Sequence, residues 1–191
     1  MASVKPPRLH QARKLRVRRL RAADVGALIE LVSKLSAQRS DDLPKNVSAI
    51  TAAEVKRHFL GHRSKFLTLV AELDGVVVAY ALLLAAYDSA RATEGLNVAD
   101  IYVNAEGRKK SVGRTLLAAC AAEAKRQGKT YLTWLSKAWD VPSHDSYRRI
   151  GAIEEPVMTH LLPLTKVPAF VAEGQTMMPA KGLRKRRPAR T

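Results

Sequence analysis

Hydrophobic residues in this chain recur with two different periods, which predict a succession of strands and helices. From Val25 to Leu35 the apolar positions are three or four residues apart, as on one face of a helix. Residues 98–103 instead mix β-branched and aromatic side chains, as strands do. From Gly113 the helical spacing returns, and Gly128 stands where a helix would end. The chain therefore alternates the two kinds of element.

Residues that start or stop elements sharpen these boundaries. Thr51 and Glu54 match a capping box, Asp24 suits a helix N-cap, and Asp74-Gly75 between two apolar runs is a strong hairpin signal. The patterns predict strands at 15–20, 66–73, 76–86, 98–103, 129–135 and 157–162, helices at 25–35, 51–60, 113–127 and 140–149, and loops at 40–48 and 87–94. This order favours an α/β (α+β) fold, with a mixed twisted sheet flanked by helices.

Length and charge place this fold in the middle of the chain. With 191 residues and 47% hydrophobic content, one domain with a good core is expected, here over residues 15–165. Residues 1–14 hold four bases and no acid, and residues 166–191 hold seven bases and one acid. Of the net charge of +16, only +6 therefore remains between these tails, which are predicted to be flexible and basic.

Several classes of protein are disfavoured by what the sequence lacks. It has no apolar run as long as a membrane span and no apolar segment after its basic N-terminus, so membrane insertion and secretion are not indicated. Its one cysteine, Cys120, cannot form an intramolecular disulfide and lies on an apolar helix face, as a core thiol does. Five scattered histidines offer no metal-ligand spacing. We predict a cytoplasmic protein without a metal.

The turn between residues 104 and 112 is the segment that points to a ligand. It leads from a strand into a helix, whose first N–H groups lack partners and suit an anion. Ser111 and Gly113 are small and would let a phosphate approach the backbone, and Ser111 and Thr115 could each offer a hydroxyl. The basic side chains gathered there are Arg108, Lys109, Lys110 and Arg114. A pyrophosphate site is one interpretation, and an ordinary charged loop is the other.

Two motifs carry a resemblance to a known family. Residues 108–113, Arg-Lys-Lys-Ser-Val-Gly, resemble the [QR]-x-x-G-x-[GA] turn of the GNAT superfamily of acyl-CoA-dependent N-acyltransferases, with Ser111 in place of the first glycine. That serine is tolerable if its φ stays negative. Asp140, Tyr147 and Gly151 resemble the N-x6-Y-x3-G-F pattern of the same family, with Asp for Asn and Ala152 for Phe. The order of elements agrees over residues 15–164.

The resemblance implies an N-acetyltransferase that moves an acetyl group from acetyl-CoA to a primary amine by direct attack in a ternary complex. The acceptor could be a small amine, an amino acid, an antibiotic or a protein amine, and helix 51–60 would border its site. The residues implied for binding acetyl-CoA are Ile101, Tyr102, Val103, Arg108, Lys109, Lys110, Ser111, Val112, Gly113, Arg114, Thr115 and Asp140. The backbone of 101–103 would pair with the pantetheine arm like an added strand.

Tyr147 and Asp100 are the catalytic residues that the resemblance suggests. Tyr147 would give its phenolic proton to the CoA thiolate. Many family members carry Glu-Asp before this strand end, and here Ala99 stands in the glutamate position. Asp100, directly or through a water, is the remaining candidate base, Glu94 is a second, and loss of the amine proton to solvent is a third.

Two functions of other kinds stay open. The domain could be the scaffold of a basic, nucleic-acid-associated protein, or it could bind acyl-CoA as a sensor without turnover. For partners, the sequence predicts an amine and acetyl-CoA, weak contact of the C-terminal tail with nucleic acid or an acidic partner, no membrane, and assembly as a homodimer. A merely solvated tail is the alternative to that contact.

Overall fold

The computed structural model describes residues 14–38, 49–61, 64–108, 111–160, 167–168 and 171. The chain divides into two units, Met1–Ala152 and Ile153–Thr191, which are taken separately here. The first unit contains β1 (Leu15–Arg19), a 3-10 turn η1 (Ala22–Asp24), α1 (Val25–Gln38), α2 (Ala52–Phe59), β2 (Leu67–Leu73), β3 (Val76–Asp88), β4 (Thr93–Val103), α3 (Val112–Arg126), β5 (Tyr131–Trp134) and α4 (Val141–Arg148).

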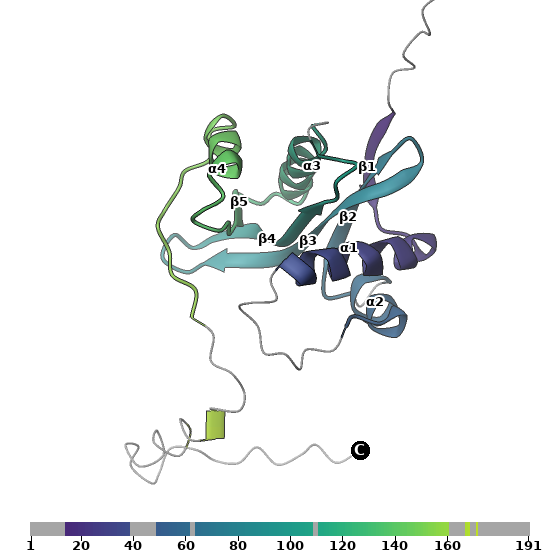
Figure 1. Ribbon diagram of the computed structural model, residues 1–191. Coiled ribbons are helices and arrows are strands. Elements are labelled where there is room, and N and C mark those ends of the chain that lie inside the picture. The colour runs from purple at the N-terminus through teal and green to yellow at the C-terminus, as the bar shows by residue number, and fades with distance from the viewer. Residues whose placement is uncertain are drawn as a thin grey trace, which may run out of the picture. The chain divides into compact units, whose positions relative to one another are not determined.

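The five strands form one sheet in the order β1-β2-β3-β4-β5. Neighbouring strands are antiparallel except β4 and β5, which pair in parallel. Helices α1 and α2 lie on one face of the sheet, and α3 and α4 lie on the other (Figure 1). The predicted mixed sheet flanked by helices is confirmed.

Each face of the sheet has its own hydrophobic core. On one face, Leu116 and Cys120 of α3 pack without exposed surface against the sheet. On the other, Leu28 of α1 and Val55 of α2 pack around Tyr80, and all three are fully buried. Burial of such side chains contributes about 1.5–3 kcal/mol each, so α1, α2 and α3 are held chiefly by these contacts.

The local signals of the sequence act as expected at three boundaries. Asp74 and Gly75 both take positive φ, 52° and 87°, and join β2 to β3 in a two-residue turn. Thr51 and Glu54 form the capping box of α2 in both directions. Gly128 has φ 68° just after α3, where only a residue without a Cβ is unstrained.

Two predicted boundaries are wrong. Residues 87–94 are not a loop, because β3 continues to Asp88 and β4 already begins at Thr93, so that their pairing closes around a four-residue turn. Asp24 is not the N-cap of α1. Its carboxylate instead accepts a hydrogen bond from the backbone N–H of Arg21 at 2.8 Å and two from the guanidinium of Arg18 at 2.6 and 3.0 Å.

The predicted last strand is also wrong over residues 157–160, which are described and contain no strand; residues 161 and 162 lie outside the described residues. Among the described residues of this second unit, the exposed large apolar side chains are Ile153, Val157, Met158 and Val171. A strand needs a partner to satisfy its backbone groups, and the described part of this unit offers none. Residues 167, 168 and 171 are helical.

Candidate active site

A β-bulge in β4 decides which way its side chains point. Asp100 pairs with Leu82, but Leu83 pairs with Val98, so Ala99 has no partner on β3. Val98 and Ile101 therefore both pack on the α3 side, although they are three residues apart. Tyr102 packs in the core under α1 and α2. Because residues two apart in a strand point to the same face, the side chain of Asp100 lies on that side as well. The bulge thus turns Asp100 away from α3.

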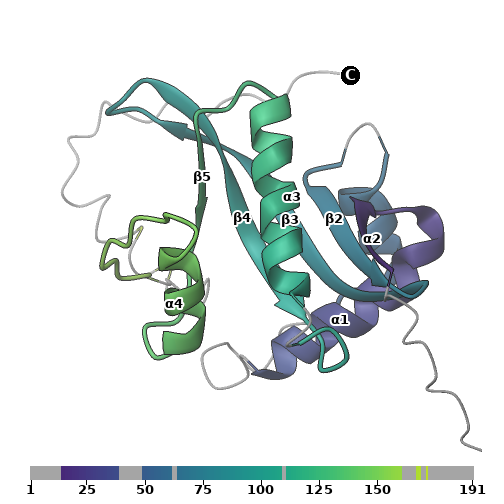
Figure 2. The same cartoon turned by 90° about the horizontal axis from the view of Figure 1, so that it is seen from above.

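Beyond the bulge, the outer edge of β4 is open. The described pairing between β4 and β5 covers Gly95–Val98, and β5 ends at Trp134. Figure 2 shows the two strands diverging from that point, with α3 beginning beside the end of β4. An exposed strand edge of this kind can pair with an extended ligand.

Along β4, the backbone N–H and C=O groups of successive residues point alternately toward β3 and toward the open edge. The N–H of Asn104 donates to the carbonyl of Val78 at 3.0 Å. Counting back in steps of two, the backbone N–H and C=O groups of Tyr102 and Asp100 therefore also point toward β3. Ile101 and Val103 consequently direct N–H and C=O away from β3. Of the three residues expected to pair with pantetheine, the backbone of Tyr102 is thus turned inward.

The turn after β4 is built around Asn104, which is buried. Its Oδ1 accepts the N–H of Gly107 at 3.0 Å, and its carbonyl accepts the N–H of Arg108 at 3.2 Å. A Cβ on Gly107 would lie 2.7 Å from a methyl of Val103, so glycine permits this packing. The turn brings Arg108 back over the strand end, where its Nε donates to the Val103 carbonyl at 3.3 Å. Lys109 and Lys110 lie outside the described residues.

The N-terminus of α3 follows at once. Ser111 precedes it with φ 60° and ψ 8°, and its side chain makes no capping hydrogen bond. The condition that its φ stay negative is therefore not met. Val112 is buried and can offer only its backbone N–H, while Arg114 is exposed. The hydroxyl of Thr115 donates to the Ser111 carbonyl at 3.0 Å.

Gly113 leaves room beside this helix end. A Cβ built on it would meet only a methyl of Val103, at an ordinary 3.5 Å. Because the first N–H groups of a helix have no partners within the helix and carry the positive end of its dipole, this uncapped terminus can hold an anion. Arg108 and Arg114 supply positive charge at the same place.

Helix α4 positions Tyr147. Asp140 caps the helix by accepting hydrogen bonds from the N–H and hydroxyl of Ser143, at 3.4 and 2.6 Å. Its carboxylate thus has a structural partner, whatever else it binds. The ring of Tyr147 meets Trp134 edge-on, with centroids 5.2 Å apart. Burial raises the pKa of Tyr147, the charge of Asp140 adds to this, and a hydrogen bond with Ser143 opposes it. Tyr147 is therefore a neutral phenol at physiological pH.

Tyr147 and Asp100 lie on opposite sides of the sheet. Tyr147 packs with the core under α3, and Asp100 faces the side of α1. Glu94 is engaged elsewhere, at the start of β4, where the ammonium of Lys129 hydrogen-bonds its carboxylate and lowers its pKa. Of the two carboxylates considered as bases, only Asp100 is near the open edge.

Sequence reasoning missed a group of charges on the α1 side. Lys34 of α1 donates to Glu30 at 2.6 Å, and the charge of Glu106 adds to the effect of Glu30 in raising the pKa of Lys34. The spacing of Glu30 and Lys34 was visible as a helical pair. Only the packing of α1 over β4 brings Lys34 within reach of the charge of Glu106, which lies in the turn after β4.

Covalent and metal chemistry find little support in the described residues. Cys120 has no exposed surface, and burial raises the pKa of its thiol to about 12, so it is not a thiolate at neutral pH. In the ranges that the structure covers, no group of three or more His, Cys, Asp or Glu could hold a metal ion. Nor does any described helix have the length and apolar character to cross a membrane.

Comparisons with known proteins agree with this geometry. Residues 33–152 match the Acetyltransferase (GNAT) family. The chain is 34% identical over 91 residues to L-ornithine N5-acetyltransferase NATA1 of Arabidopsis thaliana, an alignment that covers 47% of this chain and 39% of that relative. It therefore spans about two fifths of the length of that relative.

Solved structures of low sequence identity share the fold. An aminoglycoside acetyltransferase from an uncultured soil metagenomic sample, in complex with trehalose, superposes with a TM-score of 0.65 at 19% identity, covering 78% of this chain and 96% of that one. Glucosamine-6-phosphate N-acetyltransferase from Arabidopsis thaliana gives 0.62 at 17% identity, covering 78% and 98%. At such identities the likeness concerns the fold alone.

Proposed function

Because this chain belongs to the GNAT acetyltransferase family, we propose that it transfers an acetyl group from acetyl-CoA to a primary amine. The observation that carries the proposal is the open edge of β4 directly beside the uncapped N-terminus of α3. Family membership alone leaves room for a sensor that binds acyl-CoA without turnover. Acyl transfer needs a strand edge, an anion site and a proton donor close together, and here the donor would be the half-buried phenol of Tyr147.

The residues around this edge fit acetyl-CoA. The outward N–H and C=O groups of Ile101 and Val103 would pair with the amides of the pantetheine arm. The pyrophosphate would lie on the first turn of α3, against the backbone of Val112 and Gly113 and beside Arg108. The missing side-chain cap at Ser111 supports this placement, because a bound anion would do the work of a cap.

The reaction is a direct attack of the amine on the thioester carbonyl. Asp100, from the α1 side, would take a proton from the amine, and an outward N–H of β4 would stabilise the negative charge on the carbonyl oxygen. As the new C–N bond forms, the C–S bond breaks. Tyr147, from the α3 side, would give its proton to the departing thiolate. Because Asp100 and Tyr147 lie on opposite faces of the sheet, the base and the acid would act from opposite sides of a pantetheine arm lying between β4 and β5.

We propose a primary amine as the acceptor. The similarity to L-ornithine N5-acetyltransferase NATA1 favours an amine at the end of an aliphatic chain. That relative acts on L-ornithine according to its name, and its 34% identity exceeds that of the superposed structures. We therefore place amines of this kind first in a screen for acceptors.

The binding half of the proposal is tested by a matched pair of glycine substitutions. Gly113→Asp places a carboxylate at the second residue of α3, where the pyrophosphate would lie. Gly26→Asp makes the same change at the second residue of α1, where a Cβ meets nothing within 4 Å. Acetyl-CoA should raise the melting temperature of wild type and of Gly26→Asp but not of Gly113→Asp. Absence of binding by folded wild type would refute the proposal.

Turnover is tested separately. Release of free CoA thiol in the presence of a panel of amines, with the acetylated product identified by mass spectrometry, would establish transfer. Binding of acetyl-CoA without thiol release from any amine would identify a sensor instead.

A further inference from the structure

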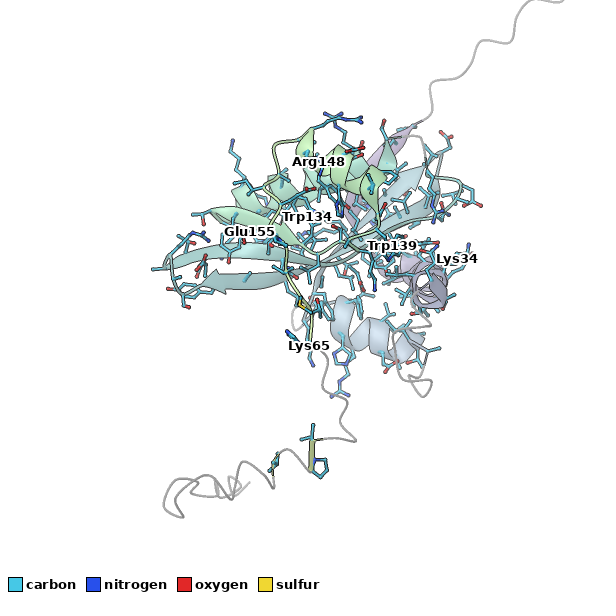
Figure 3. The ribbon with its side chains drawn as sticks, turned by 60° about the vertical axis from the view of Figure 1, so that its left-hand side comes forward. Lys34, Lys65, Trp134, Trp139, Arg148 and Glu155 are labelled. Carbon is cyan, nitrogen blue, oxygen red and sulfur yellow. The ribbon has the colours of Figure 1, made fainter. Side chains whose placement is uncertain are left out.

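The side of the sheet that Asp100 faces carries a small group of charges at the end of β4. Lys34 projects from α1, which packs on β3 and β4 on this side. Figure 3 labels Lys34 on α1, and Arg148 on α4 across the sheet. Leu31, one turn before Lys34, shares a hydrophobic core with Tyr102. Lys34 thus stands near the strand end where the acyl carbonyl would lie.

The charges in this group have both signs. The ammonium of Lys34 donates to Glu30 at 2.6 Å, and Glu106 lies close enough for its charge to act on the same ammonium. One cation therefore forms an ion pair with Glu30 and lies within electrostatic reach of a second carboxylate, that of Glu106. An ammonium has three donors, and the hydrogen bond to Glu30 uses one of them. The side chains of Lys34 and Glu30 are 44% and 67% exposed, so the pair is weak and open to a third partner.

This arrangement matches the head of an amino acid. A free amino acid carries a carboxylate, for which Lys34 is a partner, and an ammonium, for which Glu30 and Glu106 are partners. Asp100 lies two residues from Tyr102 on the same face of β4, roughly 7 Å along the strand. An aliphatic side chain could span that interval and bring a terminal amine to Asp100.

We propose that Lys34, with Glu30 and Glu106, binds the zwitterionic head of a diamino acid whose side-chain amine accepts the acetyl group. The inference rests on the proposed acetyl transfer and narrows its substrate class. Lys34 then selects acceptors with a free carboxylate over diamines, which lack one. It is a specificity-determining residue and takes no part in the chemistry.

The test compares acceptors that differ only at the head. Ornithine, its α-carboxamide and 1,4-diaminobutane present a similar amine, but only ornithine has a carboxylate. The ratio of kcat/KM for ornithine to that for the carboxamide should be about tenfold or more in wild type, the usual value of one charge-assisted hydrogen bond. Lys34→Met should bring the ratio near one, mainly through KM, and Lys34→Glu should take it below one.

Two controls separate this role from a general charge effect. Lys34→Arg keeps the cation and should keep the ratio. Lys125→Met removes an exposed lysine from the last turn of α3, on the other side of the sheet, and should also keep it. An equal ratio in wild type and Lys34→Met, or equal effects of Lys34→Met and Lys125→Met, would overturn the inference.

Calorimetry distinguishes failure of this inference from failure of the proposed function. Ornithine is titrated into wild type and Lys34→Met, each saturated with CoA. If no amine releases thiol, acetyl transfer is refuted, and the head site is still judged by this titration. If wild type binds ornithine and Lys34→Met does not, the head site is supported. If both bind ornithine equally, or if wild type does not bind it, the head site is refuted.

Discussion

The Nε of Arg108 donates a hydrogen bond to the backbone carbonyl of Val103, 3.3 Å away. That carbonyl points away from β3, toward the edge of β4 that is not paired with β5. The side chain of Arg108 thus joins the strand end to the turn before α3. Through this contact the guanidinium stands between the proposed pantetheine edge and the proposed pyrophosphate site.

Arg108→Leu should weaken the binding of acetyl-CoA about tenfold, because a phosphate contact loses its cation. Calorimetric titration of wild type and variant at low and high salt checks this, and the difference should shrink with salt. Lys125→Leu, at the other end of α3, should bind as wild type. Tighter binding by Arg108→Leu would mean that Arg108 only obstructs the Val103 carbonyl.

Ser111→Gly should stabilise the fold. Ser111 has φ 60°, a region that costs a residue with a Cβ about 1 kcal/mol and glycine almost nothing. We expect the free energy of unfolding to rise by roughly 0.5–1 kcal/mol in urea denaturation. Ser111→Ala keeps the Cβ and should show no such gain. If alanine and glycine were equally stabilising, the hydroxyl and not the backbone would be responsible.

Tyr147→Phe should reduce kcat by about a hundredfold while leaving the KM for acetyl-CoA near that of wild type, because only the proton donor is lost. The ring contact with Trp134 remains, so the melting temperature should change little. Since the pKa of Tyr147 is raised, wild type should lose no activity through phenol ionisation below about pH 10.

Tyr87→Phe, at an exposed position of β3, is the matched control and should retain wild-type kcat. Equal kcat in wild type and Tyr147→Phe across the pH range would exclude Tyr147 as the acid.

Asp24→Asn should lower the free energy of unfolding by about 2 kcal/mol at pH 7, because Arg18 loses its partner in a largely buried ion pair. Hydrogen bonds from Arg18 hold the pKa of Asp24 below its ordinary value. Its contribution is therefore complete above the unfolded pKa of about 3.9 and disappears as the pH falls through the lower folded value.

Urea denaturation of both proteins at pH 7, 5 and 3 would show this trend as a difference that narrows at pH 3. Asp145→Asn breaks an exposed pair with Arg148 and should cost less than about 0.5 kcal/mol. A difference between wild type and Asp24→Asn that persists unchanged at the lowest pH would rule out the ion pair as its source.

Cys120 should resist iodoacetamide in the native protein at pH 8 and react after unfolding in urea. Its side chain is fully buried, and the pKa of its thiol is about 12. Mass spectrometry of the intact protein measures the modification. Rapid alkylation of the folded protein would show that α3 opens, and would reopen the question of an acyl-enzyme.

Much of the fold was predictable because its signals are local. Asp74-Gly75, the Thr51 capping box and Gly128 each act within four residues, and each does so in the structure as the sequence predicted. Where a boundary depends on a distant partner, the prediction failed. The length of β4 comes from its pairing with β3 as far as Thr93, and residues 157–160 form no strand.

The sequence by itself determined the order of elements as far as α4, the strand-turn-helix at residues 98–128 and the family to which the chain belongs. Only the tertiary structure decided the faces and edges of the candidate site. The bulge at Ala99 sets the side on which Asp100 lies, and the short pairing with β5 leaves Ile101 and Val103 exposed at the edge. The packing of α1 on β4 also brings Lys34 within reach of the charge of Glu106, in the turn after the strand. The reason is physical: a turn or a cap depends on neighbours in the chain, whereas register and facing depend on strands and helices that meet only when the chain folds.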